Sequence, residues 1–168
     1  MIRATWLGAC LAAFLISAAT GAGPAARSAT PDEARSALLF VALNVSDLDR
    51  ALRFYTDVLG MKETQRFGAD AGDPKRPVEV VLRFGDDTSG AFLLLTHTSG
   101  DTAPREIGNG FSRVAFTVPA VAPLVDRVRQ AGYAVTMAPK LIPEVGVEVA
   151  LVTDPDGYTV ELIEFKET

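Results

Sequence analysis

Cysteine and histidine are almost absent from this chain of 168 residues, which contains one of each, Cys10 and His97. Cys10 lies in an N-terminal segment that we expect to be removed, so the mature protein is predicted to have no thiol. Such a protein forms no disulfide, has no cysteine nucleophile and offers no sulfur ligand to zinc. Clusters of basic residues are also missing, and the formal net charge is −5. Nucleic acid is therefore not expected as a partner.

The first 22 residues have the features of a secretory signal. A short start with one positive charge, Met1–Arg3, precedes an uncharged apolar run over 6–19, and small residues follow. This order is typical of a signal peptide, and the apolar run is too short for a membrane-spanning helix. Cleavage is expected near Gly21 or Ala22. Residues 1–22 thus predict export, to the periplasm or out of the cell, with no membrane attachment after cleavage.

Two alternatives to a cleaved signal stay open. Leu7–Cys10 superficially resembles a lipid-attachment box, although only a few apolar residues precede Cys10. The apolar run is also compatible with an uncleaved membrane anchor. Residues 23–37 are small, polar and proline-containing, which predicts a disordered lead-in. The remaining residues, 38–166, have the usual length of one domain with a single core.

The domain is predicted to contain two copies of the same unit. In the first half, Ser46 is expected to cap a helix that Gly60 ends, and in the second half a helix over 119–131 ends at Gly132. The two glycines are 72 residues apart. Strands are expected at 38–45, 61–67, 78–84 and 91–96, and again at 113–118, 133–137, 145–153 and 159–164. This pattern predicts an α+β protein with two βαβββ repeats that pair into a curved, half-closed barrel around a cleft.

Two segments of the sequence resemble a known family. The segment 45–62 (VSDLDRALRFYTDVLGMK) is similar to the first helix of glyoxalase I, and 154–164 (DPDGYTVELIE) is similar to its closing hairpin. The chain is identified by them as a glyoxalase I-like member of the vicinal oxygen chelate superfamily, with the bleomycin resistance proteins and extradiol dioxygenases. The resemblance covers residues 38–165 and implies the fold described above. We interpret both motifs as building the fold, which does not by itself fix the function.

The resemblance also implies positions for a divalent metal, one on each of four strands. In this sequence those positions carry Phe40, Leu94, Arg113 and Glu161. Only Glu161 is a ligand type, because hydrocarbon side chains have no lone pair and Arg113 has a fixed positive charge. His97 is three residues from Leu94 and is expected to face the other side of the sheet in a structural role. No metal and no cofactor are therefore expected, and metal-dependent catalysis is not predicted.

Strand alternation predicts which side chains line the cleft. The predicted ligand-binding residues are Phe40, Asn44, Phe92, Leu94, Arg113, Thr117 and Glu161. Arg113 and Glu161 are expected to form an ion pair where the metal would otherwise lie. This pair is either a structural plug of two buried charges or an anchor at which Arg113 binds an anionic group of a ligand.

Three functions are compatible with these features. The first is a small-molecule-binding protein without a metal, similar to the sequestering antibiotic-resistance members of the family. The second is a lyase- or isomerase-type enzyme resembling lactoylglutathione lyase, either metal-independent with Glu161 as general base or with an atypical metal site. The third is an interaction module without chemistry. We favour the first, and the resemblance also implies a homodimer.

Overall fold

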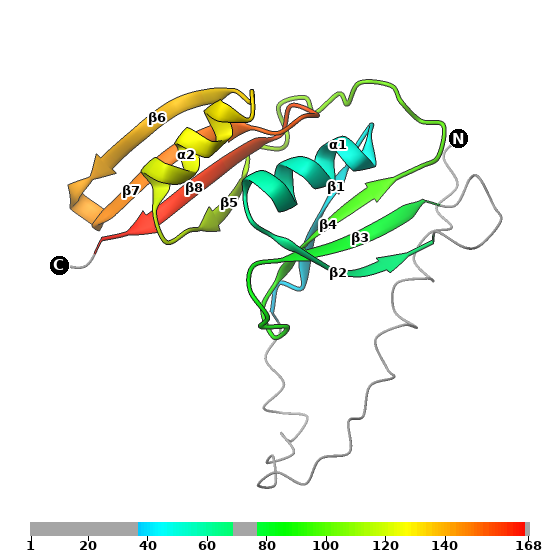
Figure 1. The fold of residues 1–168 in the computed structure, drawn as a ribbon, viewed down its shortest axis with the longest axis horizontal. Helices are drawn as coiled ribbons and strands as arrows, with labels where there is room; N and C mark the ends of the chain where they lie inside the picture. Colours follow the sequence, from blue (N-terminus) through cyan, green and yellow to red (C-terminus); the bar gives the residue numbers. More distant parts are fainter. Residues whose placement is uncertain (1–36, 69–76, 167–168) are drawn as a thin grey trace, which may run out of the picture. The chain divides into compact units, whose positions relative to one another are not determined.

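The computed structural model describes residues 37–68 and 77–166, and these residues form two open four-stranded sheets (Figure 1). The segment Leu38–Thr168 is a compact unit by its own contacts. The predicted signal peptide, 1–22, and the lead-in up to residue 36 lie outside the described residues. In the part of the chain that is described, no helix is long and apolar enough to cross a membrane.

The first repeat follows the predicted order of one strand, a helix and three strands. Its elements are β1 (Phe40–Asn44), α1 (Leu48–Leu52), the π-helical continuation η3 (Arg53–Val58), β2 (Lys62–Phe67), β3 (Val78–Arg83) and β4 (Phe92–His97). The strand order in the sheet is β1-β4-β3-β2, with β1 and β4 parallel and the other pairs antiparallel.

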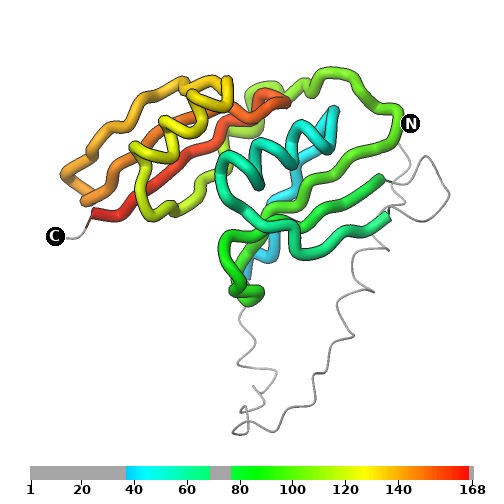
Figure 2. The backbone as a smooth tube through the Cα atoms, viewed as in Figure 1, coloured from blue at the N-terminus to red at the C-terminus, as the bar shows by residue number. Residues whose placement is uncertain are grey.

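The second repeat has the same topology. Its elements are β5 (Val114–Thr117), α2 (Val121–Gln130), β6 (Val135–Ile142), the 3₁₀ turn η4 (Pro143–Val145), β7 (Val147–Thr153) and β8 (Thr159–Phe165). The order β5-β8-β7-β6, with β5 and β8 parallel, matches the first sheet strand for strand (Figure 2). The predicted α+β class with two βαβββ repeats is confirmed.

One hydrophobic core joins the helix-bearing sides of the two sheets. It contains buried residues from α1, α2 and both sheets. Phe54 of η3 is fully buried, and its ring meets Tyr133 of the second repeat edge-on at 4.8 Å between centroids. The two helices lie on the same side of their sheets (Figure 1). Burial of apolar surface on this side therefore stabilises both repeats together.

Three local expectations need correction. Asp47 rather than Ser46 caps α1, because its carboxylate accepts a hydrogen bond from the backbone N–H of Arg50 at 2.9 Å. Strand β6 extends to Ile142, beyond the predicted end at residue 137, because it is an edge strand, where Pro139 removes no needed hydrogen bond. Arg113 directly precedes β5 instead of lying within it.

Candidate functional site

The sheet faces that look away from the helices carry the residues predicted to line the cleft. In the parallel pair of β1 and β4, Phe40 is opposite Phe92 and Asn44 is opposite Thr96. Their neighbours Leu43, Leu93 and Leu95 belong to the helix-side core. Because side chains alternate along a strand, Phe40, Asn44, Phe92 and Leu94 point to the other side, which we call the open face of each sheet.

The open face of the first sheet is apolar near its middle. Val81, Phe92 and Leu94 form a buried cluster separate from the main core, with Phe40 and Phe67 packed against it. The rings of Phe40 and Phe92 lie 5.2 Å apart and are tilted by 30°. Leu94 in this buried cluster and the partly buried Phe40 beside it occupy two of the positions where the resemblance implies a metal.

The open face of the second sheet carries the predicted ion pair. Arg113 donates from Nε to Oε2 of Glu161 at 2.6 Å, and its Nη1 donates to Oγ of Ser112 at 3.2 Å. Val160 and Leu162 on either side of Glu161 are in the core, so Glu161 faces away from the helices. Thr117 shares this face and is exposed.

The exposure of the pair is uneven. The Arg113 side chain is 48% exposed and the Glu161 side chain is 17% exposed. A plug of two buried charges would require both side chains to be shielded, and the Arg113 side chain is not. Arg113 keeps further N–H donors for an incoming anion, because a guanidinium has five.

His97 has a structural role, as expected. Its Nδ1 lies 3.0 Å from the carbonyl oxygen of Val45, which accepts the hydrogen bond. His97 follows the core residues Leu93 and Leu95 at alternate positions of β4, so it is on the helix side of the sheet. It is therefore on the face opposite to Leu94.

The two family motifs meet in a polar network at the junction of the repeats. Tyr55 donates from its hydroxyl to Oδ2 of Asp154 at 2.9 Å, while Oδ1 of Asp154 accepts from the backbone N–H groups of Asp156 and Tyr158. The hydroxyl of Ser46 donates to Asp156 in a short hydrogen bond. Burial, with the nearby Asp154, raises the pKa of Tyr55 well above its usual value, and burial also raises the pKa of Asp154. This network locks the first helix to the last hairpin.

Sequence reasoning missed Arg83 as a residue of the open face. In β3 it follows Val81 by two positions, and Val81 is opposite Leu94 in the sheet. The same alternation that placed Leu94 therefore places Arg83 on the open face. From sequence alone, however, a charged residue at the end of a strand is expected to be exposed to solvent. Arg83 is instead 8% exposed.

Comparison with known proteins agrees with this architecture. The family model described as Glyoxalase/Bleomycin resistance protein/Dioxygenase superfamily matches residues 37–162. A lactoylglutathione lyase of Arabidopsis thaliana is 38% identical over 134 residues, which are 80% of this chain and 46% of that relative. The lactoylglutathione lyase of Salmonella typhimurium is 34% identical over 131 residues, which are 77% of this chain and 93% of that relative.

Solved structures agree as well. A crystal structure of glyoxalase I from Zea mays has a TM-score of 0.68 at 30% identity, over 78% of this chain and 45% of that one. The chain spans about half the length of the Arabidopsis and maize proteins. The paired βαβββ repeats define a glyoxalase-like α+β protein. With the match over 37–162, the chain belongs to the Glyoxalase/Bleomycin resistance protein/Dioxygenase superfamily.

The four positions at which the family implies a divalent metal do not fit one here. Phe40 and Leu94 have no lone pair to donate, and Arg113 is positively charged and already paired with Glu161. Within residues 37–68 and 77–166, no three His, Cys, Asp or Glu side chains gather closely enough to hold a metal ion.

Proposed function

We propose that this protein is an exported small-molecule-binding member of its superfamily that works without the family's divalent metal. The Arg113–Glu161 ion pair carries the proposal, because it stands at two of the four metal positions and leaves a half-exposed guanidinium there. A guanidinium binds carboxylates and phosphates through two parallel hydrogen bonds. Of the other two positions, the partly buried Phe40 supplies apolar surface for the rest of the ligand, and Leu94 is buried next to it.

The metal content tests this proposal most directly. Protein purified without added metal should contain no stoichiometric nickel, zinc or iron by elemental analysis. A lactoylglutathione-forming assay should show no turnover that a chelator removes. Stoichiometric metal, or chelator-sensitive turnover, would overturn the proposal.

Replacement of Arg113 tests its role as an anchor. 1-Anilinonaphthalene-8-sulfonate combines an apolar ring system with a fixed negative charge, so Arg113→Ala should weaken its binding roughly 10-fold. Arg129→Ala is the matched control, because Arg129 is 50% exposed and pairs with Asp126 on the surface of α2. Equal binding by wild type and both variants would remove Arg113 from the site.

Catalysis is the second candidate, and the lactoylglutathione lyases at 38% and 34% identity favour it. In this case Glu161 acts as the general base, and Arg113 holds its carboxylate in place through the 2.6 Å hydrogen bond. Glu161→Gln would then abolish turnover while ligand binding remains. A protein that only binds small molecules shows no turnover in either form.

The proposal also includes export and a homodimer. The sequence of residues 1–22 supports export, and fractionation of cells followed by N-terminal sequencing of the mature protein tests it. Exposed apolar side chains at one end of the second sheet, including Leu141, Val145 and Phe165, support self-association. Analytical ultracentrifugation of the mature protein should give twice the mass of the chain.

A further inference from the structure

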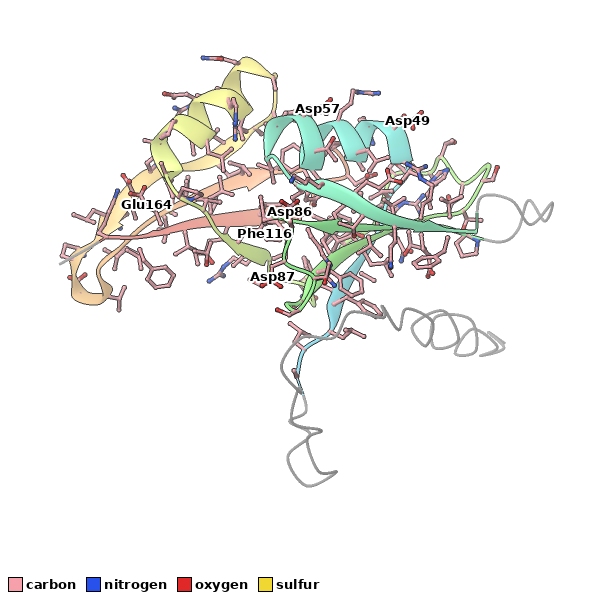
Figure 3. All side chains as sticks on the ribbon, turned by 60° about the horizontal axis from the view of Figure 1, so that its bottom comes forward. Asp49, Asp57, Asp86, Asp87, Phe116 and Glu164 are labelled. Atoms are coloured by element: carbon pink, nitrogen blue, oxygen red, sulfur yellow. The ribbon has the colours of Figure 1, made fainter. Side chains whose placement is uncertain are left out.

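Two positions of the sequence place asparagine or aspartate directly before glycine. Asn109-Gly110 is in the linker 98–113, which joins β4 to β5, and Asp156-Gly157 is in the hairpin between β7 and β8. The linker ends at β5, the strand whose Phe116 is labelled in Figure 3. At such a position the backbone nitrogen of glycine can attack the side-chain carbonyl carbon of the residue before it, because no Cβ obstructs the approach. The two positions differ in the folded chain.

Hydrogen bonds hold the Asp156-Gly157 position in place. The side chain of Asp156 is 1% exposed, and its Oδ1 accepts hydrogen bonds from the backbone N–H and the hydroxyl of Ser46. The backbone N–H of Gly157 donates to the carbonyl oxygen of Asp154 at 3.1 Å. A nitrogen held in this bond, beside a carboxylate held by Ser46, is kept from the geometry that ring closure needs. The fold therefore protects Asp156.

The Asn109-Gly110 position lies instead at an exposed turn. Asn109 is flanked by Gly108 and Gly110, and all three residues are exposed. Apart from its chain neighbours, no described atom lies within 4 Å of the point where a Cβ of Gly110 would be. The N–H of Gly110 donates to no backbone carbonyl of the described residues, in contrast to the N–H of Gly157. The nitrogen of Gly110 is thus open to reaction.

Contacts on both sides of this turn fix the linker without covering it. Before the turn, the Arg105 guanidinium donates to the carboxylate and to the backbone carbonyl of Asp101, both at 2.9 Å. After the turn, the ring of Phe111 meets the ring of Tyr158 edge-on at 5.7 Å between centroids. A reaction at Asn109 therefore requires no unfolding of a strand or helix.

Asn44, the other asparagine of the chain, is exposed as well but has an unreactive neighbour. Val45 follows it and is 1% exposed. The N–H of Val45 donates to the carbonyl oxygen of Thr96 at 2.9 Å, and its branched side chain crowds the nitrogen. Attack by this nitrogen would break a hydrogen bond of the first sheet. Asn44 is therefore an internal control for Asn109.

We propose that Asn109 is a site of spontaneous covalent modification, at which the side-chain amide is lost through a cyclic imide. The backbone nitrogen of Gly110 bonds to Cγ of Asn109, and the bond from Cγ to the side-chain nitrogen breaks. That nitrogen leaves as ammonia with the proton of the Gly110 N–H. Water then adds to one of the two imide carbonyls and opens the ring. Opening at Cγ gives aspartate, and opening at the backbone carbonyl gives isoaspartate.

The modification changes the charge and the length of the linker. Both products carry a carboxylate where Asn109 is neutral, four residues from Arg105 and four from Arg113. Isoaspartate also routes the backbone through Cβ, which lengthens the connection between the two repeats. Neither product depends on a ligand or a metal, so this inference stands or fails separately from the proposed function.

Incubation of the purified, folded chain at neutral and at mildly alkaline pH tests the inference. Ion-exchange chromatography should reveal a more acidic form, which accumulates faster at the higher pH because the attacking nitrogen must lose its proton. Peptide mapping by mass spectrometry should show that the peptide with Asn109 has exchanged an amino group for a hydroxyl group. The peptide with Asn44 should keep its mass, and Asp156 should form isoaspartate only in chain unfolded in urea, where its hydrogen bonds are lost.

Two variants test the chemistry of the step. Gly110→Ala is compatible with the fold, because the φ of Gly110 is not positive and the space around it is open. The added methyl group should slow the conversion of Asn109 roughly 10-fold. Asn109→Gln keeps the amide but requires a larger ring, so the acidic form should be lost. Circular dichroism verifies that both variants are folded.

Each result decides the inference. An Asn109 peptide of unchanged mass in the folded protein overturns it, whether or not the unfolded chain reacts. Conversion of Asn44 or Asp156 in the folded protein at the rate of Asn109 also overturns it, because the fold would then not select the site. An undiminished rate in Gly110→Ala or Asn109→Gln contradicts the cyclic imide.

Discussion

The two βαβββ repeats are similar in packing on the sheet side that faces the helices, and they differ in side-chain chemistry on the opposite, open side. On the helix side they contribute to one core, in which Phe54 and Tyr133 meet across the repeats. On the open side, the first sheet buries Arg83 against Phe92 with no carboxylate of the described residues paired to it, whereas the second pairs a half-exposed Arg113 with Glu161. The requirements of core packing thus keep the two repeats similar on the helix side. The open faces do not share this core, so their side chains can differ in chemistry.

Among the changes considered, loss of the packing shared by the two repeats should lower the stability of the fold most. Phe54→Ala removes a fully buried ring between the repeats, so the free energy of unfolding should fall by about 3–5 kcal/mol. Urea unfolding followed by circular dichroism measures this change. The exposed Leu38, replaced by alanine, is the control and should alter stability by less than about 0.5 kcal/mol. A small effect of Phe54→Ala would show that the repeats are stable without their common core.

Disruption of the polar network at the junction of the repeats should have the second-largest effect on stability. Asp154→Ala leaves the hydroxyl of Tyr55 and two backbone N–H groups without their acceptor, which should lower stability by about 2–3 kcal/mol. Tyr55→Phe removes one of these donors with its hydroxyl and should cost less. Urea unfolding of the two variants and the double variant measures how strongly the pair is coupled.

The pH dependence of stability distinguishes Asp154 from an exposed carboxylate. Burial raises its pKa in the folded protein above the unfolded value, so the folded state binds the proton more tightly. The stability that this group contributes is therefore present at pH below its unfolded pKa and is lost as the pH rises through its folded pKa. Asp154→Asn should lack this component of the pH profile, while Asp126→Asn on the surface of α2 should keep it. Identical profiles for wild type and Asp154→Asn would contradict the prediction.

The buried guanidinium should show a smaller effect of opposite sign. Arg83→Met replaces a buried charge, which forms no ion pair among the described residues, by an apolar side chain of similar length, so the protein should gain on the order of 1 kcal/mol of stability. Chemical unfolding without added ligand measures it. A clear loss of stability would mean that the contacts of Arg83 with Gly90 and Phe92 outweigh the cost of burying its charge.

Alternation along strands explains how much of the site was predictable from the sequence. Phe40, Leu94 and Glu161 fall on the expected faces, because a shift of one residue would turn core side chains into solvent. The choice of Asp47 over Ser46 as helix cap depends on Asp156, which is 110 positions away from Ser46 and binds it. The burial of Arg83 depends on Phe92, on another strand. Which of two neighbouring residues caps a helix, or whether a charged side chain is buried, is decided by contacts with distant parts of the chain. A local sequence pattern does not contain this information.

The ion pair of the second sheet should contribute least to stability. Arg113 is 48% exposed, so water screens its interaction with Glu161, and ordering the two side chains offsets part of the gain. A double-mutant cycle of Arg113→Ala and Glu161→Gln should give a coupling free energy of about 0.2–1 kcal/mol that falls with added salt. A coupling above about 2 kcal/mol would make the pair a structural element of the sheet. A small coupling, together with weaker binding of anionic probes by Arg113→Ala, would instead show that Arg113 serves ligand binding more than stability. The arginines of the two open faces would then differ in role, since Arg83 is buried against Phe92 and Arg113 is half exposed.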